Sequence, residues 1–141
     1  MKADPALFAA SVAFACACAF GSGVAIRQDV PGEPFGISSP LSVPSGILLG
    51  WGAGVAAPWP MPLAALISTT RATRVEGGAV PGFLCAGLGL ACIAGTLIEP
   101  VTYHRRPWTP AIPLAIAVNL IASVALAAIG GRHGRRRPAR Y

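Results

Sequence analysis

Residues 46–68 read GILLGWGAGVAAPWPMPLAALIS, an apolar stretch that contains no charged residue. As a helix it would be long enough to cross the hydrocarbon core of a bilayer, which is about 30 Å thick. Three prolines at alternate positions, Pro58, Pro60 and Pro62, interrupt it. Each proline removes a backbone donor and disfavours helix at the residue before it. We therefore expect residues 57–61 to be extended and the stretch to make one crossing from two half-helices.

Three further apolar runs have the length of a membrane span, at residues 5–26, 79–98 and 110–129. Together with residues 46–68 they predict an all-α membrane protein, a four-transmembrane-helix bundle. This single domain would cover residues 1–131 and be followed by a basic tail, residues 132–141. For the second span, a helix that begins near Ser38 and leaves the prolines at the membrane surface is an alternative.

The first run could instead be a cleaved signal peptide. Against this, its apolar stretch is long, and the only preceding cation, Lys2, is offset by Asp4. Asp4 followed by Pro5 is also typical of a helix N-terminus, because the carboxylate can cap the helix and proline fits the first helical position. We therefore expect the first run to be a retained helix.

The composition supports a membrane protein rather than a soluble one. Only 11% of the residues are charged and 54% are hydrophobic, whereas soluble domains carry about a quarter charged residues. Every charged residue lies at or beyond the end of an apolar run, as expected where a charge at mid-bilayer costs at least a few kcal/mol. The net charge of +6 does not indicate nucleic-acid binding, since no soluble fold remains to present it.

The distribution of positive charges predicts an orientation. With both termini cytoplasmic, the inside holds Lys2, Arg71, Arg74 and five arginines of the tail, against Arg27, Arg105 and Arg106 outside. We expect a multi-pass protein of the cell (inner) membrane, and the abundance of Arg, Ala and Gly suggests a bacterial gene. The tail would bind anionic lipid or serve only as a topogenic signal; the arginines concerned are Arg132, Arg135, Arg136 and Arg137.

Small residues at four-residue spacing predict close helix packing, because helices associate in lipid through close contact and a few polar groups. These residues are Gly46, Gly50 and Gly54 in the second span and Gly87, Ala91 and Gly95 in the third. Such stripes favour a tight bundle and also a homo-oligomer or a larger membrane complex. Asn119, a carboxamide deep in the last run, is expected to join helices, with contact to a substrate or ion as the alternative.

Two places could carry chemistry. The interruption of the second span could face a substrate through Trp59 and Met61, as the broken helices of transporters do. Glu99 and His104, near the outer end of the third run, could form an acid–base pair. Catalysis therefore remains unassigned. No metal site, cofactor site or redox pair of cysteines is expected from the motifs present.

Three functions are compatible with these features. The leading one is a helix-packing accessory protein or oligomeric subunit. The second is a small transporter or flippase component that uses the broken second helix. The third is a membrane enzyme that acts on a lipidic substrate at Glu99 and His104. An aqueous cavity that reaches residues 57–61 would favour the second function, and a lateral lipid cleft that ends at Glu99 would favour the third.

Overall fold

The computed structural model describes residues 4–72, 79–103 and 109–135 of the 141-residue chain, and the side chains up to residue 70 in the first of these ranges. Helices make up nearly all of its regular structure. Within the described residues no strand is present, and Ala53 and Ala56 form an isolated β-bridge. The elements are α1 (Pro5–Gln28), η1 (Pro34–Gly36), α2 (Val43–Leu49), α3 (Pro60–Ala72), α4 (Val80–Ile98), η2 (Pro100–Thr102) and α5 (Ala111–Arg135).

Three helices, α1, α4 and α5, are long and apolar enough to cross a membrane. Their outward-facing side chains are also apolar, including Phe20 of α1, Leu90 of α4 and Ile121 of α5, which is 70% exposed. Large apolar side chains on an outer surface are unfavourable in water and match a lipid environment. The protein is therefore a membrane protein, and its apolar helices fit a lipid bilayer.

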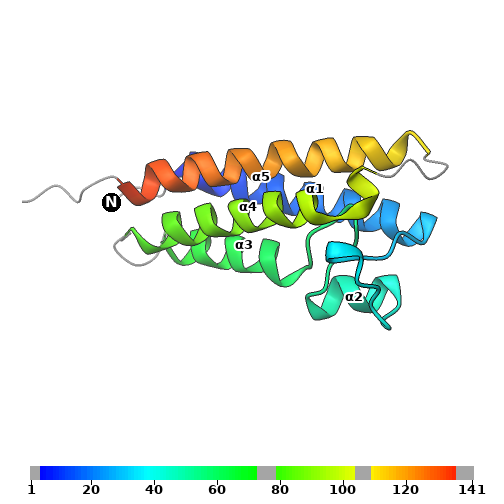
Figure 1. Cartoon of the computed structure of the whole chain (residues 1–141). Coiled ribbons are helices and arrows are strands. Elements are labelled where there is room, and N and C mark those ends of the chain that lie inside the picture. Colours follow the sequence, from blue (N-terminus) through cyan, green and yellow to red (C-terminus); the bar gives the residue numbers. More distant parts are fainter. Residues whose placement is uncertain (1–3, 73–78, 104–108, 136–141) are drawn as a thin grey trace, which may run out of the picture.

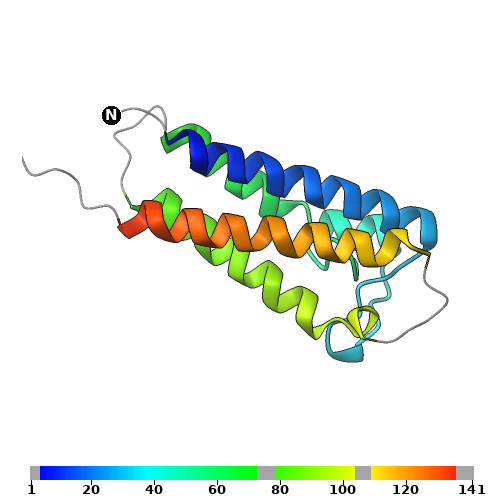
Figure 2. The same cartoon turned by 90° about the horizontal axis from the view of Figure 1, so that it is seen from above.

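The long helices lie side by side, and the chain runs back and forth along them (Figures 1 and 2). The start of α1 and the end of α5 lie at the same end of the bundle. There, Asp4 caps α1 by accepting hydrogen bonds from the N–H groups of Ala6 and Leu7. Its other carboxylate oxygen lies 3.0 Å from Nδ1 of His133, a residue of the last turn of α5. The turn η2 and the loop around η1 lie at the opposite end (Figure 1).

Glycines of α4 and α5 let these two helices approach closely. A Cβ atom added to Gly89 would lie 2.6 Å from the carbonyl oxygen of Ser123, and one added to Gly82 would lie 2.5 Å from the nitrogen of Gly134. Gly130 likewise lies against the backbone of α4, since a Cβ atom added to it would lie 2.7 Å from the nitrogen of Ala86. The sequence predicted that this helix ends near residue 129. Because of this packing, α5 instead continues through Gly130-Gly131 to Arg135.

The second predicted span is not one helix over residues 46–68. It is divided between α2, seven residues long, and α3, thirteen residues long, of which the longer would reach only about 20 Å. The break lies earlier than predicted, since residues 50–59 are non-helical while Pro60 and Met61 already belong to α3. The expectation of extended backbone through residue 61 was wrong because Pro60 and Pro62 lie in the first turn of α3, and only Pro58 precedes it.

Candidate functional site

Residues 50–59, called the irregular segment below, have an exposed start at Gly50 and Trp51 and a buried middle. Residues 52–57 are all buried. The segment begins where α2 ends, at Gly50, whose φ of 103° is a left-handed conformation that glycine adopts without strain. The N–H of Gly52 then donates to the carbonyl of Gly46, 3.0 Å away, and that of Trp59 donates to the carbonyl of Ile47, also 3.0 Å away. The carbonyls of Gly46 and Ile47, which the end of α2 leaves without partners inside the helix, thus accept hydrogen bonds from the segment.

The prolines remove the backbone donors that the start of α3 would otherwise leave unpaired. A helix begins with N–H groups that have no partner inside the helix, and hydrocarbon offers them none. Here Pro60 and Pro62 have no N–H, and the N–H of Met61 donates to the carbonyl of Pro58, 3.0 Å away. The N–H of Leu63 makes the first regular helical bond, to Trp59. The alternate prolines therefore allow a helix to begin away from water.

Asn119 of α5 anchors the irregular segment at mid-length of the bundle. Its Nδ2 donates to the carbonyl of Val55, 2.8 Å away, and lies 3.3 Å from the carbonyl of Ala17, which is central in α1. A third carbonyl, that of Ala115, lies 3.1 Å away. If the amide nitrogen and oxygen of Asn119 were exchanged, the amide oxygen would face three carbonyl oxygens, and all four atoms are acceptors. The orientation with Nδ2 facing the carbonyls is therefore the favourable one. Gly21 leaves room for the contact, because an added Cβ would lie 2.4 Å from the carbonyl oxygen of Val55.

A cavity of about 110 Å³ lies between the irregular segment and the second half of α4. We call it the α4 cavity. Its lining is mostly apolar and includes Trp51, Met61, Ala91, Cys92, Gly95 and Glu99. A Cβ added to Gly95 would meet nothing within 4 Å, so the absence of a side chain there leaves open space. The small residues of α4 thus shape the cavity on this side.

Glu99 is the acidic group of the α4 cavity. It follows the last residue of α4, is 7% exposed, and accepts a hydrogen bond at Oε2 from the backbone N–H of Glu33, 2.9 Å away. Burial raises the pKa of Glu99 above its usual value, the N–H of Glu33 opposes that rise, and the negative charge of Glu33 adds to it. No described residue donates to the second oxygen, Oε1.

The predicted ligand-contacting residues divide between the cavity and its support. Met61 and Glu99 line the α4 cavity. Trp59 does not line it and packs instead against a cluster of buried apolar residues that includes Ile47. Asn119 is 2% exposed and contacts helices and the irregular segment, and its Oδ1 takes no hydrogen bond within the described part of the chain. His104 lies outside the described residues, so its pairing with Glu99 stays a prediction.

The two predicted glycine stripes have different places in the structure. Gly46, Gly50 and Gly54 do not share a helix face, because α2 ends at Leu49 and Gly54 lies in the irregular segment. A Cβ atom added to Gly46 would lie 3.0 Å from the carbonyl oxygen of Gly52. One added to Gly54 would lie 2.7 Å from the side chain of Val101. On α4, Gly87 and Ala91 are exposed and Gly95 is half-buried. Among the described residues, a Cβ added to Gly87 or Gly95 would meet nothing within 4 Å, so neither glycine makes a close helix contact there.

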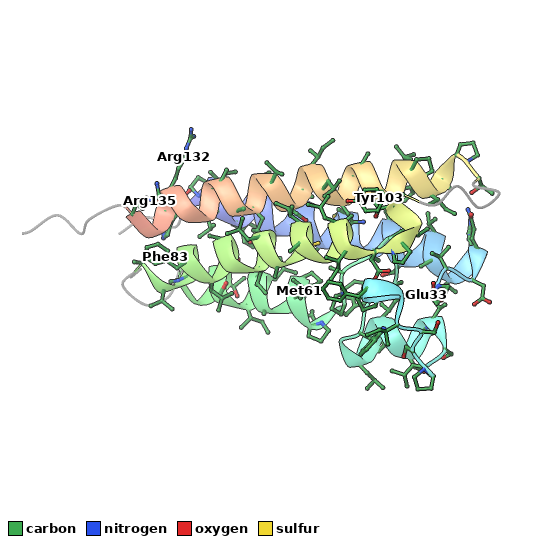
Figure 3. All side chains as sticks on the ribbon, in the orientation of Figure 1. Glu33, Met61, Phe83, Tyr103, Arg132 and Arg135 are labelled. Atoms are coloured by element: carbon green, nitrogen blue, oxygen red, sulfur yellow. The ribbon has the colours of Figure 1, made fainter. Side chains whose placement is uncertain are left out.

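The basic residues expected to bind anionic lipid are described in part. Arg132 and Arg135 are exposed on the last turns of α5, at the end of the bundle opposite Glu33 and Tyr103 (Figure 3). Arg136 and Arg137 lie outside the described residues.

Sequence reasoning missed two residues of the site. Trp51 lines the α4 cavity and donates through Nε1 to the carbonyl of Gly32, 3.0 Å away. Glu33 supplies the N–H that binds Glu99. The neighbouring Gly50 and Gly52 could have indicated a tight turn beside Trp51, but no spacing relates Glu33 to Glu99, which lie 66 positions apart.

Comparison with known protein families, with curated proteins and with solved structures found no match to this chain.

Proposed function

We propose that the protein is a membrane-embedded binding protein whose α4 cavity takes a small amphipathic ligand from the bilayer, as a component of a transporter or flippase. In this proposal the chain crosses a bacterial inner membrane four times, with α2, the irregular segment and α3 together forming the second crossing. Both termini are cytoplasmic. The adjacency of Asp4 and His133 and the five arginines of residues 132–141 support this arrangement.

The observation that carries the proposal is the combination of open space and a buried carboxylate beside the irregular segment. Gly95 and Ala91 leave the side of the cavity free of bulky side chains, and Glu99 provides a polar group in a mostly apolar lining. Apolar walls with a few polar groups are the usual composition of ligand sites. The volume of about 110 Å³ suits a head group or a short chain rather than a whole lipid.

Filling the cavity tests the proposal. Gly95→Leu places a side chain in the open space, whereas Gly87→Leu places the same side chain on the exposed face of α4, outside the cavity lining. Protein extracted in mild detergent would be analysed by native mass spectrometry for co-purifying small molecules. We expect the wild type and Gly87→Leu to retain a bound amphiphile and Gly95→Leu to lose it. Equal retention by Gly95→Leu, or no bound molecule in the wild type, would contradict the proposal.

An accessory role through helix contacts is a second candidate, favoured by the exposure of α4. In the most apolar 18 residues of α4 only 22% are buried, compared with 50% in those of α1. A Cβ added to Gly87 would meet nothing within 4 Å. A homo-oligomer or a partner helix could pack on this face. Gly87→Leu would then shift the mass of the detergent-solubilised complex to that of the monomer, while Gly95→Leu would not. An unchanged mass for Gly87→Leu would exclude this face as the interface.

A membrane enzyme with Glu99 and His104 as an acid–base pair is the remaining alternative. Glu99 in the cavity is compatible with it, but no described group beside Glu99 completes a catalytic arrangement.

A further inference from the structure

The charges around the α4 cavity point to a ligand of one kind. The described residues that line it include Glu99 and no lysine, arginine or histidine. Among the described residues, the charge of Glu33, also an acid, acts on Glu99. An ionised carboxylate inside an apolar lining is unfavourable unless a cation or several donors meet it. The N–H of Glu33, which is the donor to Glu99 within the described part of the chain, satisfies part of this requirement.

Two other lining residues suit a soft cation. Trp51 borders the cavity with its indole held by the hydrogen bond to Gly32, and the face of an indole attracts cations electrostatically. Met61, at the start of α3, adds a flexible and polarisable thioether. An ammonium group that carries alkyl substituents would meet both an anion and polarisable apolar surface here.

The opening of the cavity determines what the rest of the ligand contacts. Ala91 is exposed, and Leu90 beside it on α4 is 61% exposed, so this side of the cavity meets the surroundings of the outer face of α4. In a bilayer those surroundings are acyl chains. A head group inside the cavity could therefore remain joined to a chain that stays in lipid.

Resting on the binding function proposed above, we propose that the α4 cavity binds the cationic head group of a single-chain amphiphile, such as an alkylammonium, and that the Glu99 carboxylate pairs with its charge. The charge selects cations over anions, and the cavity space limits the size of the head group. The charge selection depends on Glu99 and the available space depends on Gly95, so each property can be removed by a separate substitution.

The test uses the full chain in nanodiscs of zwitterionic lipid. Binding of decyltrimethylammonium, decyl sulfate and the uncharged decyl maltoside is measured by equilibrium dialysis. Three variants accompany the wild type. Glu99→Gln keeps the shape and an acceptor for Glu33 but removes the charge, and Gly95→Leu fills the cavity. Asp29→Asn removes an exposed acid that does not line the cavity. Helical circular dichroism and thermal unfolding confirm that each variant is folded.

We expect the wild type to bind the ammonium compound and not the sulfate. Glu99→Gln should weaken ammonium binding about tenfold or more, since loss of a partly buried charge pair is worth at least that factor, while Asp29→Asn stays within about threefold. Gly95→Leu should abolish it. If Gly95→Leu abolishes binding of the amphiphiles while Glu99→Gln leaves cation binding unchanged, the cavity binds ligand and the cation assignment is overturned. Preference for the sulfate or the maltoside would overturn it too. If no amphiphile binds in a way that Gly95→Leu abolishes, the binding function itself fails.

Discussion

At the scale of single residues, the side chain of Asn119 links three parts of the chain that are far apart in sequence. Its amide nitrogen meets carbonyls of Val55 and Ala17 as well as its own helix. The carbonyl of Val55 lies in non-helical backbone, so Asn119 supplies the donor that a regular helix would have supplied. The sequence indicated a helix-joining role for this residue, but its main partner is the irregular segment.

Replacement of Asn119 by leucine should destabilise the protein by about 1–3 kcal/mol, because the carbonyl of Val55 would remain buried without a donor. Hydrogen exchange of the amides of residues 51–58 should also become faster. Ser123→Ala is the matched control, since the Ser123 hydroxyl donates to the carbonyl of Asn119 within the same helix. Thermal unfolding in detergent and hydrogen-exchange mass spectrometry measure both effects. Equal stability and exchange for the two variants would show that Asn119 does not hold the segment.

Glu99 is a residue whose burial carries a cost in stability. Its pKa in the folded protein is raised above the usual value of 4.5, mainly by burial. The folded state therefore binds this proton more tightly than the unfolded state, so the contribution of Glu99 to stability is greatest below pH 4.5 and falls as the pH rises through the folded pKa. Glu33 is the other acid acting on it.

Glu99→Gln should accordingly raise the melting temperature at pH 7, because glutamine fills the same space without a charge. The difference from the wild type should shrink as the pH falls below 4.5, because the carboxyl group then becomes protonated in the unfolded state as well as in the folded state. Melting curves at a series of pH values measure this. A variant that melts below the wild type at pH 7 would show that the carboxylate is paired favourably in the folded protein.

At the scale of elements, α3 shows how a helix can begin inside a membrane protein. Proline is usually a signal against helix, and the alternate prolines were interpreted in that way. At the first and third positions of a helix, however, their missing N–H groups are the ones that would have no partner. The sequence therefore indicated the existence of the break but placed it too late, because Pro60 was interpreted as part of the break and not as the start of α3.

Pro62→Ala should destabilise the protein by about 1–3 kcal/mol, because it introduces a buried N–H without a partner. Pro81→Ala, at the first turn of α4, is the control. Pro81 is partly exposed at the bundle end that holds Asp4 and His133, where water can satisfy a new N–H, so the change should cost less. Urea or thermal unfolding in detergent distinguishes the two. A larger loss for Pro81→Ala would contradict this explanation of the prolines.

At the scale of the whole molecule, apolar run length predicted three long helices well. The first and third runs match α1 and α4 to within about two residues at each end, because membrane thickness sets their length. The pairing of α4 with α5 was not predictable, since Gly82, Gly89 and Gly130 fall outside the four-residue stripes. The α4 cavity was not predictable either. It depends on the contact between Glu33 and Glu99 and on the path of the irregular segment, neither of which leaves a periodic signal.

Residues 50–59 form a non-helical segment whose buried middle is held against α5 and borders the α4 cavity. Nuclear magnetic resonance of the isotopically labelled chain in nanodiscs tests it most directly. We expect helical carbon chemical shifts for residues 43–49 and 60–72 and non-helical shifts between them. We also expect nuclear Overhauser contacts from the Asn119 side-chain amide to Val55. Helical shifts without interruption from residue 46 to residue 68, with no contact between Asn119 and Val55, would contradict it.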